Sequence, residues 1–581
     1  MIRVLASCIG KYKLDSLLAP FFVVLEVVME VLIPFLMADL IDNGITVGDM
    51  AYIEKLGLIL ILCALLSLGF GALSGFFSAR ASAGFSKNLR KRIYDQIQAF
   101  SFANIDKFST PGLITRMTTD VNNVQQAFTM IIRVAVRSPI MLVLALVCSV
   151  RLNGALSLVF LAALPILGVG LYFIMTGAHP YFTKLFKAYD HLNTVVQENL
   201  RAIRVVKSFV REDHETEKFH GTSGEIYDFA THAEKLLVLN NPLMMFVVYG
   251  SMLAISWFGA RFIVAGTMTT GELVSMITYT MQILMSLMML SMIFVMIVMA
   301  RASAIRISEV LTEVPELANP ASPLETVADG SVRFENVSFA YAGKGHPYCL
   351  KNIDLTIPSG STVGILGSTG SSKSTLVQLI PRLYDATEGR VLVGGRDVRD
   401  YDMEVLRDSV AMVLQNNELF SGTIKENLRW GDKDAADAEL VEACVLAEAD
   451  GFIRSFPEGY DTHIEQGGAN VSGGQKQRLC IARALLKKPK ILILDDSTHA
   501  VDTATDAKIR ASLRRCLPET TKIVIAQRVA SVEQSDFIIV LEDGEIVAAG
   551  DHDTLMKTSE AYRETALSQK KGDDFDAAET R

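Results

Sequence analysis

The apolar residues of the chain are concentrated before residue 300, where they form six long runs. The runs span residues 17–41, 56–77, 128–150, 156–175, 236–262 and 273–300. Each is near or above the ~20 residues that cross a bilayer as an α-helix. Six buried helices of a large soluble domain are the alternative, but the length of the runs and their few charges argue against it. The pattern therefore predicts an all-α polytopic membrane domain over residues 1–317, with six long transmembrane helices in a lipid bilayer.

The hydrophobic pattern changes after residue 317. Residues 318–331 are rich in Pro, Ala and Glu, as a linker would be. From Val332 onward, short apolar runs such as 363–366 and 537–541 alternate with segments of helical periodicity. That alternation predicts an α/β domain over residues 332–569. The polar residues 570–581 predict a disordered tail.

The loops between the runs predict which way the chain crosses the membrane. Lys and Arg are concentrated in the two long links, at 80–92 and 184–211, whereas the link between the first two spans is acidic. Because cytoplasmic loops carry the excess of Lys and Arg, we expect both long links, both termini and the α/β domain in the cytoplasm. The long links have helical patterning, so we expect them to form helical fingers that extend the spans.

Composition and charge exclude several classes of protein. The chain of 581 residues is 50% hydrophobic and 20% charged, which excludes a disordered or collagen-like protein. The formal net charge of −9 argues against a nucleic-acid-binding surface, so no nucleic acid is expected as a partner. The 7 cysteines include no Cys-x-x-Cys pair and give no sign of a zinc site or a disulfide framework.

A segment rich in glycine and serine links the apolar run 362–366 to a helical segment at 375–380. A phosphate-binding loop requires this context, since backbone N–H groups and the positive end of the helix bind polyphosphate. Lys373 is expected to contact the β- and γ-phosphates, and Ser374 to ligate Mg²⁺. The candidate residues are Gly367, Ser368, Thr369, Gly370, Ser371, Ser372, Lys373, Ser374 and Thr375. Ser372 stands where the pattern has Gly, so its Cβ strains the loop if the position needs a positive φ.

Two further motifs point to the same chemistry. A buried strand at 491–495 ends in Asp495, a carboxylate expected to bind Mg²⁺ beside the phosphates. The segment 471–478 precedes an Ala- and Leu-rich helix, which predicts a second anion site at a helix N-terminus. The residues of this signature segment are Val471, Ser472, Gly473, Gly474 and Gln475.

Together these three motifs resemble the ATP-binding cassette of ABC transporters. Six spans ahead of one α/β P-loop cassette are similar to a half-transporter of the exporter (type IV) fold, so the resemblance covers nearly the whole chain. It implies ATP and Mg²⁺ as cofactors, ATPase activity coupled to transport, and location in a bacterial cytoplasmic membrane. It also implies that Tyr341 stacks on adenine, that Gln415 senses Mg²⁺ and contacts the fingers, and that Asp502 belongs to a loop that crosses the dimer interface. The fingers are then expected to end near residues 104–108 and 209–214.

Three residues around the ATP site depart from the pattern of this family. Asp496 stands where the family has a catalytic Glu that polarises the attacking water, so its carboxylate is one methylene shorter. Misplacing a general base by about 1 Å can cost roughly 10²-fold in rate. Gln527 replaces the switch histidine; it can donate to a γ-phosphate but cannot carry a positive charge. His499 replaces a serine in the loop after the strand.

The signature segment, in contrast, is intact apart from Val471 in place of Leu. In the family, each ATP lies between the Walker motifs of one chain and the signature of the other. A catalytic half-site that departs from the family pattern, together with an intact signature, resembles one subunit of a heterodimeric exporter. The resemblance implies a second, non-identical half-transporter as partner, which supplies a Glu and a His. The ATP site of this chain is then expected to hydrolyse slowly or not at all.

The implied function is ATP-driven export of amphipathic small molecules, as in multidrug exporters. Five methionines of the sixth span are spaced by three or four residues, which puts most of them on one helix face. Adaptable thioether chains suit a varied apolar pathway, although ordinary helix packing explains them equally well. They are Met281, Met285, Met288, Met292 and Met296. Glu26 and Glu30 in the first span would attract cationic compounds or be satisfied by neighbouring helices. Arg133 and Arg137 are expected to extend to the inner membrane boundary. An exporter-fold importer, a peptide or lipid transporter, and an ATP-gated channel or regulatory subunit remain open.

Overall fold

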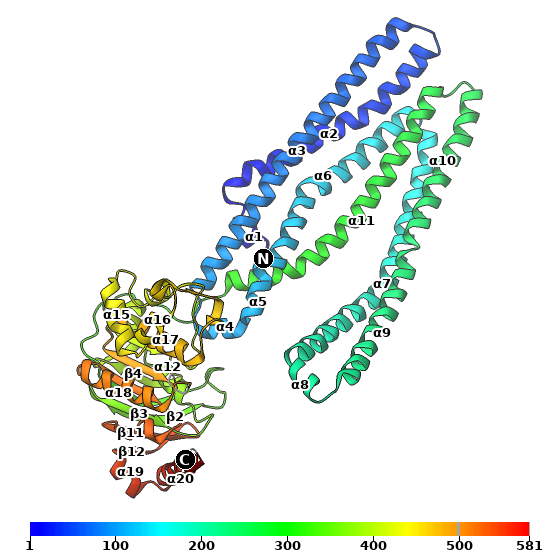
Figure 1. The fold of residues 1–581 in the computed structure, drawn as a ribbon. Helices are drawn as coiled ribbons and strands as arrows, with labels where there is room; N and C mark the ends of the chain where they lie inside the picture. Colours follow the sequence, from blue (N-terminus) through cyan, green and yellow to red (C-terminus); the bar gives the residue numbers. More distant parts are fainter. Residues whose placement is uncertain (497–499, 580–581) are drawn as a thin grey trace. The chain divides into compact units, whose positions relative to one another are not determined.

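The computed structural model describes the backbone of residues 1–496 and 500–579, and the side chains within these ranges apart from those of 291, 294, 295, 298, 299 and 570–579. The chain divides into two compact units. The first unit comprises Met1–Gln98 and Pro111–Thr312, and the second comprises Ala99–Thr110 and Glu313–Arg581 (Figure 1). The second unit therefore includes a short segment of the first long link.

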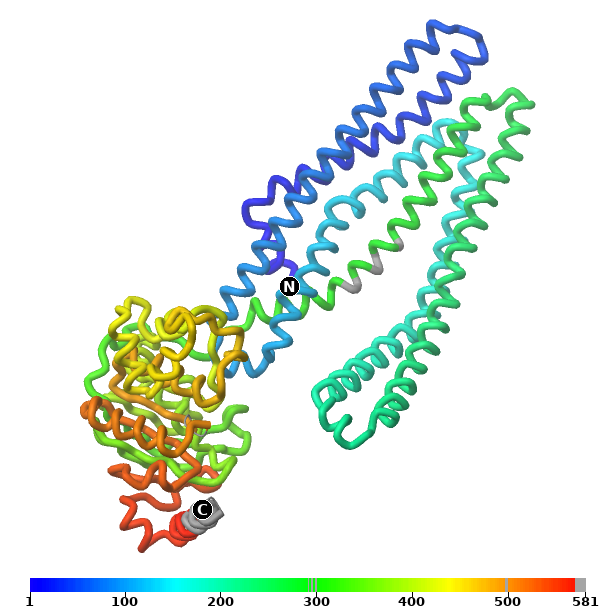
Figure 2. The backbone as a smooth tube through the Cα atoms, viewed as in Figure 1, coloured from blue at the N-terminus to red at the C-terminus, as the bar shows by residue number. Residues whose placement is uncertain are grey.

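The first unit is built from long helices, of which α3, α6, α7 and α11 extend well beyond the apolar runs within them (Figure 2). Its long helices are α2 (Lys13–Asp39), α3 (Met50–Gln98), α6 (Val121–Leu152), α7 (Gly154–Arg201), α9 (Glu212–Leu237), α10 (Asn240–Val264) and α11 (Thr270–Thr312). Its short elements are α1 (Ile2–Ser7), α5 (Thr110–Thr115), α8 (Ile203–Ser208), a 3₁₀ turn (Gly10–Tyr12) and two π-helical turns (Leu40–Ile45 and Arg116–Asp120). Within the described residues, 6 helical stretches are long and apolar enough to cross a membrane, which confirms the six predicted spans.

Helices α2 and α3 pack side by side in antiparallel directions. Phe22 stacks on Phe77 with 5.6 Å between the ring centroids. Tyr12 packs so closely on Gly84 that a Cβ there would lie 2.3 Å from the tyrosine ring, so this position requires glycine. Other apolar side chains of α3, such as Leu58 and Leu68, are 68% and 70% exposed, as expected of a helix with one side toward lipid.

The second unit is built on two main sheets. A six-stranded sheet has the order β12-β11-β3-β10-β9-β6, in which β12 alone pairs in the antiparallel sense. A four-stranded antiparallel sheet has the order β2-β1-β4-β5, and β7 pairs with β8. The strands are β1 (Val332–Phe339), β2 (Leu350–Ile357), β3 (Thr362–Leu366), β4 (Glu388–Val393), β5 (Arg396–Asp397), β6 (Val410–Val413), β7 (Gly422–Thr423), β8 (His463–Ile464), β9 (Ile491–Asp495), β10 (Thr521–Ile525), β11 (Phe537–Glu542) and β12 (Glu545–Gly550).

Strand β9 separates two cores, because successive side chains of a strand point to opposite faces. Leu492 and Leu494 belong to a core shared with the helices, whereas Ile491 and Ile493 pack toward the antiparallel sheet. The helices of the second unit are α4 (Phe102–Phe108), α12 (Lys373–Gln378), α13 (Met403–Ser409), α14 (Ile424–Leu428), α15 (Asp437–Leu446), α16 (Asp450–Ser455), α17 (Gly473–Leu486), α18 (Thr503–Cys516), α19 (His552–Thr558) and α20 (Glu560–Glu579). The sheets and helices confirm the predicted α/β domain.

The end of the chain differs from the prediction of a disordered tail from residue 570. Helix α20 continues to Glu579, so residues 570–579 are helical. Tyr562 anchors the first turn of this helix in the core with 1% exposure. Ala and Glu, which are frequent in α20, are strong helix formers and favour this continuation of the helix.

Candidate functional site

The predicted phosphate-binding loop joins β3 to α12 at the carboxyl edge of the parallel strands. In the register of the sheet, Ile365 pairs with Ile525 and Ile525 pairs with Asp495, so the ends of β3, β10 and β9 meet at this edge. Gly367 begins the loop at φ 157°, and a Cβ there would lie 2.2 Å from a backbone oxygen of Leu541. Only glycine fits this turn, which brings the loop backbone to the edge where Asp495 ends its strand.

Ser372 meets the condition under which the sequence predicts strain. Its backbone has φ 68° and ψ 25°, in the left-handed region, immediately before the first residue of α12. A residue with a Cβ costs about 1–2 kcal/mol in this conformation, where the usual glycine would cost little. The loop therefore keeps the shape of a phosphate-binding loop at the expense of backbone strain.

The Lys373 side chain is directed into the loop. Its ammonium donates to the backbone oxygens of Gly367 at 2.8 Å and Ser368 at 2.7 Å, and it lies 3.3 Å from the hydroxyl of Ser371. Burial lowers the pKa of Lys373 below its ordinary value. A polyphosphate at this position would offset that desolvation by placing negative charge beside the ammonium.

The residues predicted to hold Mg²⁺ lie together. The Ser374 hydroxyl donates to Asp495 Oδ1 at 2.9 Å, and Gln415 lines the same cleft. Asp495 is only 3% exposed, and this burial raises the pKa of its carboxyl group. A cation beside the carboxylate would offset the cost of removing its charge from water. A hydroxyl, a carboxylate and an amide oxygen beside a phosphate site are oxygen donors of the kind that Mg²⁺ takes, so the donor set fits this ion.

A cleft of about 250 Å³ brings most of the predicted nucleotide residues together. It is lined by Thr369, Gly370, Ser372, Lys373, Ser374, Thr375, Gln415, Asp495, Asp496, Ile525 and Gln527. Gly367 and Ser368 instead line an adjacent cavity with Tyr562 of α20. Tyr341 lies beside the cleft, where its hydroxyl is 3.0 Å from Thr375 Oγ1 and its ring is half-exposed.

The two residues that replace the catalytic Glu and the switch His contact each other. Gln527 Nε2 donates to Asp496 Oδ2 at 2.8 Å. Asp496 is itself in the left-handed region at φ 47°, and its backbone N–H donates to the oxygen of Ile525 at 3.1 Å. The third departure, His499, lies outside the described residues.

The signature segment begins α17. Ser472 caps this helix: its hydroxyl accepts from the Gln475 N–H at 3.3 Å, and the Gln475 side chain accepts from the Ser472 N–H at 2.9 Å. A Cβ on Gly474 would lie 2.9 Å from the oxygen of Ala500, so the helix end packs on the loop before α18. Asp502 caps α18 by accepting from the Thr505 N–H at 2.9 Å. Among the described residues, none of the signature segment lines the cleft, so the structure does not bring this chain's signature to its own phosphate loop.

Two glutamines that the motifs did not single out support these loops. Gln477 accepts from the Ala500 N–H at 3.1 Å and so ties α17 to the loop before α18. Gln569 of α20 donates to the oxygen of Gln527 at 2.9 Å and accepts from the Val529 N–H at 2.8 Å. No local pattern marks either residue, because each acts through backbone groups that are distant in sequence.

The first finger ends in α4, where the sequence predicts it. Asn104 forms a capping box with Ser101 and donates to the oxygen of Val314 at 3.3 Å. The Tyr384 hydroxyl donates to Asp106 at 2.9 Å, and the Tyr384 ring lies 6.1 Å from that of Phe102. These contacts place α4 in the second unit. The second finger turns between α8, which ends at Ser208, and α9, which begins at Glu212.

The carboxylates of the first span are held by an arginine. Arg137 of α6 donates to Glu26 at 2.5 Å and to both carboxylate oxygens of Glu30 at 2.7 Å. The location of Arg137 at the inner membrane boundary stays a prediction; its pairing with both carboxylates is less costly than leaving them unpaired. Arg133, four residues away, forms no ion pair within the described part of the chain.

The methionines of α11 share an exposed side of the helix. Met281, Met285, Met288 and Met292 are 40%, 59%, 37% and 59% exposed, and Met296 is half-buried. Packing inside this chain therefore does not account for the methionine spacing. The surface that they form is open to lipid, to a pathway or to another chain.

Comparison with known proteins gives matches over both units. Residues 16–306 match the family model of the ABC transporter transmembrane region, and residues 350–499 match that of the ABC transporter. An ABC transporter ATP-binding protein of Mycobacterium tuberculosis strain CDC 1551 is 38% identical over 549 residues, which are 92% of this chain and 93% of that protein. YfiB of Bacillus subtilis strain 168 is 36% identical over 566 residues, with 97% and 98% covered.

Two further likenesses concern function and fold. A fatty acid ABC transporter ATP-binding/permease protein of Mycobacterium bovis is 32% identical over 474 residues, which are 82% of this chain and 75% of that protein. Among solved structures, a bacterial Atm1-family ABC exporter with ATP bound is similar with a TM-score of 0.82 and 25% identity, covering 96% of this chain and 99% of the other.

Proposed function

The chain belongs to the ABC transporter family, and from this premise we propose that it is one subunit of a heterodimeric exporter with a catalytically impaired ATP site of its own. Its six spans and its cassette make it an exporter-type transporter whose ATPase is coupled to transport. The proposal of an impaired ATP site rests on the contact between Asp496 and Gln527 at the catalytic positions.

This contact supports an impaired site because the side chains at the two catalytic positions hydrogen-bond to each other. One of the two amide N–H groups with which Gln527 could donate to a γ-phosphate is directed at Asp496 Oδ2. The Asp496 carboxylate must leave this bond and also reach about 1 Å further than its own length allows to accept a proton from water, which can cost roughly 10²-fold in rate.

ATP binding itself is expected to persist. Lys373 and the backbone N–H groups of the loop would hold the β- and γ-phosphates. Ser374, Asp495 and Gln415 would hold Mg²⁺, which when bound neutralises phosphate charge. The half-exposed ring of Tyr341 offers a face for adenine.

The signature segment is proposed to serve the partner's ATP. The N-terminus of α17 is a site for anions, and Gly473 and Gly474 let a phosphate approach its backbone N–H groups closely. Ser472 adds a hydroxyl at the same end of the helix. The partner half-transporter then supplies the Glu and the His that this chain lacks, and Asp502 lies in the loop between the two cassettes.

The proposed substrates are amphipathic small molecules, moved out of a cell across its cytoplasmic membrane with the cassette in the cytoplasm. The exposed methionine side of α11 supports an adaptable apolar pathway. A fatty acid or similar lipid is a second candidate, favoured by the 32% identity to a fatty acid ABC transporter of Mycobacterium bovis.

The test is the ATPase activity of the full-length chain, purified alone and then co-expressed with a half-transporter that has Glu and His at the corresponding positions. We expect turnover roughly 10²-fold higher together, abolished by Glu→Gln in the partner and changed less than about twofold by Asp496→Asn. Lys373→Ala is the matched control for Asp496→Asn. It should weaken nucleotide binding to this chain's site, so it separates the effect of binding from the effect of hydrolysis at that site. Robust turnover by the chain alone that Asp496→Asn abolishes would contradict the proposal.

A further inference from the structure

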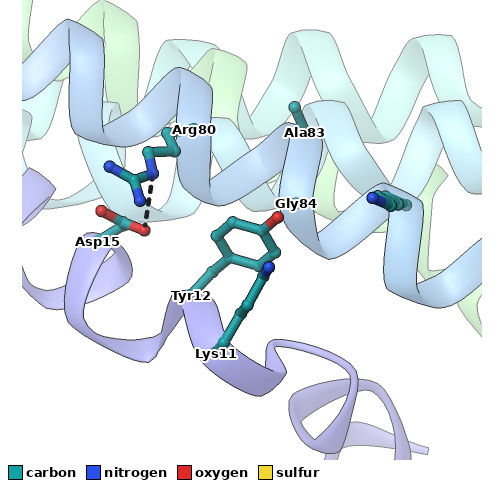
Figure 3. Close-up of a pocket in the computed structure, with 7 residues that line it drawn as sticks. Lys11, Tyr12, Asp15, Arg80, Ala83 and Gly84 are labelled. Carbon is teal, nitrogen blue, oxygen red and sulfur yellow. Dashed lines mark ion pairs between the residues drawn. The ribbon is translucent and has the colours of Figure 1, made fainter.

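A cavity of about 380 Å³ lies between the start of α2 and the middle of α3, apart from the nucleotide site (Figure 3). It is lined by Lys11, Tyr12, Asp15, Arg80, Ala83, Gly84 and Lys87. Tyr12 projects between the two helical segments toward Gly84, and Lys11 extends alongside it (Figure 3). The cavity is therefore formed by residues about 70 positions apart that antiparallel packing brings together.

The cavity carries an excess of positive charge. Its three cationic side chains and one carboxylate leave a formal charge of +2. Asp15 offsets only Arg80, at 3.5 Å, and within the described residues neither Lys11 nor Lys87 forms an ion pair. The Lys11 ammonium instead lies 5.5 Å from the centroid of the Tyr12 ring. Two ammonium groups and a phenol hydroxyl are thus available to an anion.

The wall of the cavity is held in place by contacts beside it. Tyr12 packs against the backbone at Gly84, as noted above. The Asn88 amide donates to the oxygen of Cys8 at 2.9 Å, which fixes the N-terminal segment on α3. The basic groups therefore lie on a fixed frame rather than on a free terminus.

The position of the cavity along the helices matches the headgroup level of a bilayer. The apolar run of α2 begins at residue 17, two positions after Asp15, and that of α3 ends at residue 77, three before Arg80. On the apolar side, Phe21 and Phe76 are 55% and 59% exposed, and each packs edge-on against a ring of the Phe22–Phe77 stack that joins α2 to α3. A ligand with an anionic head and apolar chains would fit both features, with its head at the basic cavity and its chains along the exposed rings.

We propose that this cavity binds the phosphate headgroup of an anionic phospholipid, with its acyl chains along α2 and α3 beside Phe21 and Phe76. A free phosphate shares the headgroup chemistry but makes no use of the exposed rings. A zwitterionic lipid brings its own cation to a cavity that is already positive.

The test measures thermal stabilisation of the full-length protein in neutral detergent by added phosphatidylglycerol, phosphatidylcholine or inorganic phosphate. Only phosphatidylglycerol should stabilise, with saturable concentration dependence. Lys11→Gln with Lys87→Gln should raise its apparent Kd roughly 25-fold, from about fivefold for each lysine at a membrane surface. Lys13→Gln with Lys91→Gln removes two nearby lysines that do not line the cavity, and should change the Kd less than about threefold because salt screens charges that do not contact the headgroup.

Three results would overturn the assignment. An equal loss in both double variants would mean diffuse attraction rather than a site. Equal stabilisation by phosphatidylcholine would remove the role of the headgroup charge, and equal stabilisation by inorganic phosphate would remove the role of the lipid. Lys11→Arg with Lys87→Arg keeps the charge and should keep the affinity, so loss of binding in this folded variant would also count against the proposal.

Discussion

Removing the charge of Arg137 should destabilise the membrane unit, because this side chain holds two carboxylates inside the bundle. Arg137 makes three hydrogen bonds of 2.5 to 2.7 Å with Glu26 and Glu30. Glu26 is 8% exposed, and its Oε2 has no hydrogen-bond partner within the described residues. The carboxylate of Glu26 also lies 3.2 Å from where a Cβ on Gly71 of α3 would be, so it occupies a space that glycine leaves open.

The magnitude follows from the cost of an unpaired buried charge. Breaking such a pair from one side costs about 3–5 kcal/mol, a factor of roughly 150 to 5,000 in the ratio of folded to unfolded protein. Arg137→Met should therefore lose most of the stability of the membrane unit. Glu30→Gln should cost less than about 1 kcal/mol, because it leaves one carboxylate with one guanidinium and keeps an acceptor for a hydrogen bond. The predicted loss of stability is therefore large for Arg137→Met and small for Glu30→Gln.

The assay is the fraction of monodisperse protein that remains after brief heating in detergent, compared as the temperature of half-loss since unfolding is expected to be irreversible. The combined variant Glu26→Gln, Glu30→Gln and Arg137→Met carries no charge and should recover most of the loss of Arg137→Met. Nucleotide binding at ambient temperature serves as the control for an intact cassette. The reasoning fails if Arg137→Met is as stable as the wild type, or if the combined variant is as damaged as the single one.

Two further changes test the cassette. Tyr384→Phe removes the hydrogen bond to Asp106 but keeps the ring near Phe102, so it should cost about 1 kcal/mol. The loss should appear as faster hydrogen exchange over residues 99–110, with unchanged ATP affinity. Unchanged exchange would show that the hydrogen bond contributes nothing to stability. Ser372→Gly removes a left-handed residue with a Cβ whose strain is already present without nucleotide, so relief of about 1 kcal/mol should raise the thermal stability of the cassette with little change in ATP affinity. Weaker ATP binding by calorimetry would mean that the serine side chain assists the nucleotide.

The sequence predicts most of what lies close together along the chain. The run that becomes β3, the glycine at 367 and the lysine at 373 form one local unit, so their spacing alone indicates a phosphate-binding loop. The parallel register then brings Asp495 to the same edge, and the motif predicts this too. The left-handed backbone at Ser372 also follows from the motif, since glycine is usual where φ is positive.

Contacts across the membrane helices could not be predicted in the same way. Glu26 and Arg137 are 111 residues apart, and a long apolar helix can rotate or slide against its neighbour without changing its own pattern. The sequence therefore leaves the partner of Glu26 open and gives no partner for Arg137. The same limit applies to Gln569, whose role depends on where α20 meets the backbone at Gln527 and Val529.

The inclusion of α4 in the second unit has a consequence for the order of synthesis. Asp106 and Tyr384 are 278 residues apart, so at about 5–20 residues per second the tyrosine leaves the ribosome roughly 14 to 56 s after the helix that it contacts. During that interval the first finger is complete but has no cassette to bind. The cassette, in turn, can contact Phe102 through Tyr384 only after the membrane spans between them have been translated. Chains that stall or are cut in this interval would expose the same aromatic face, which marks them for recognition by chaperones and proteases.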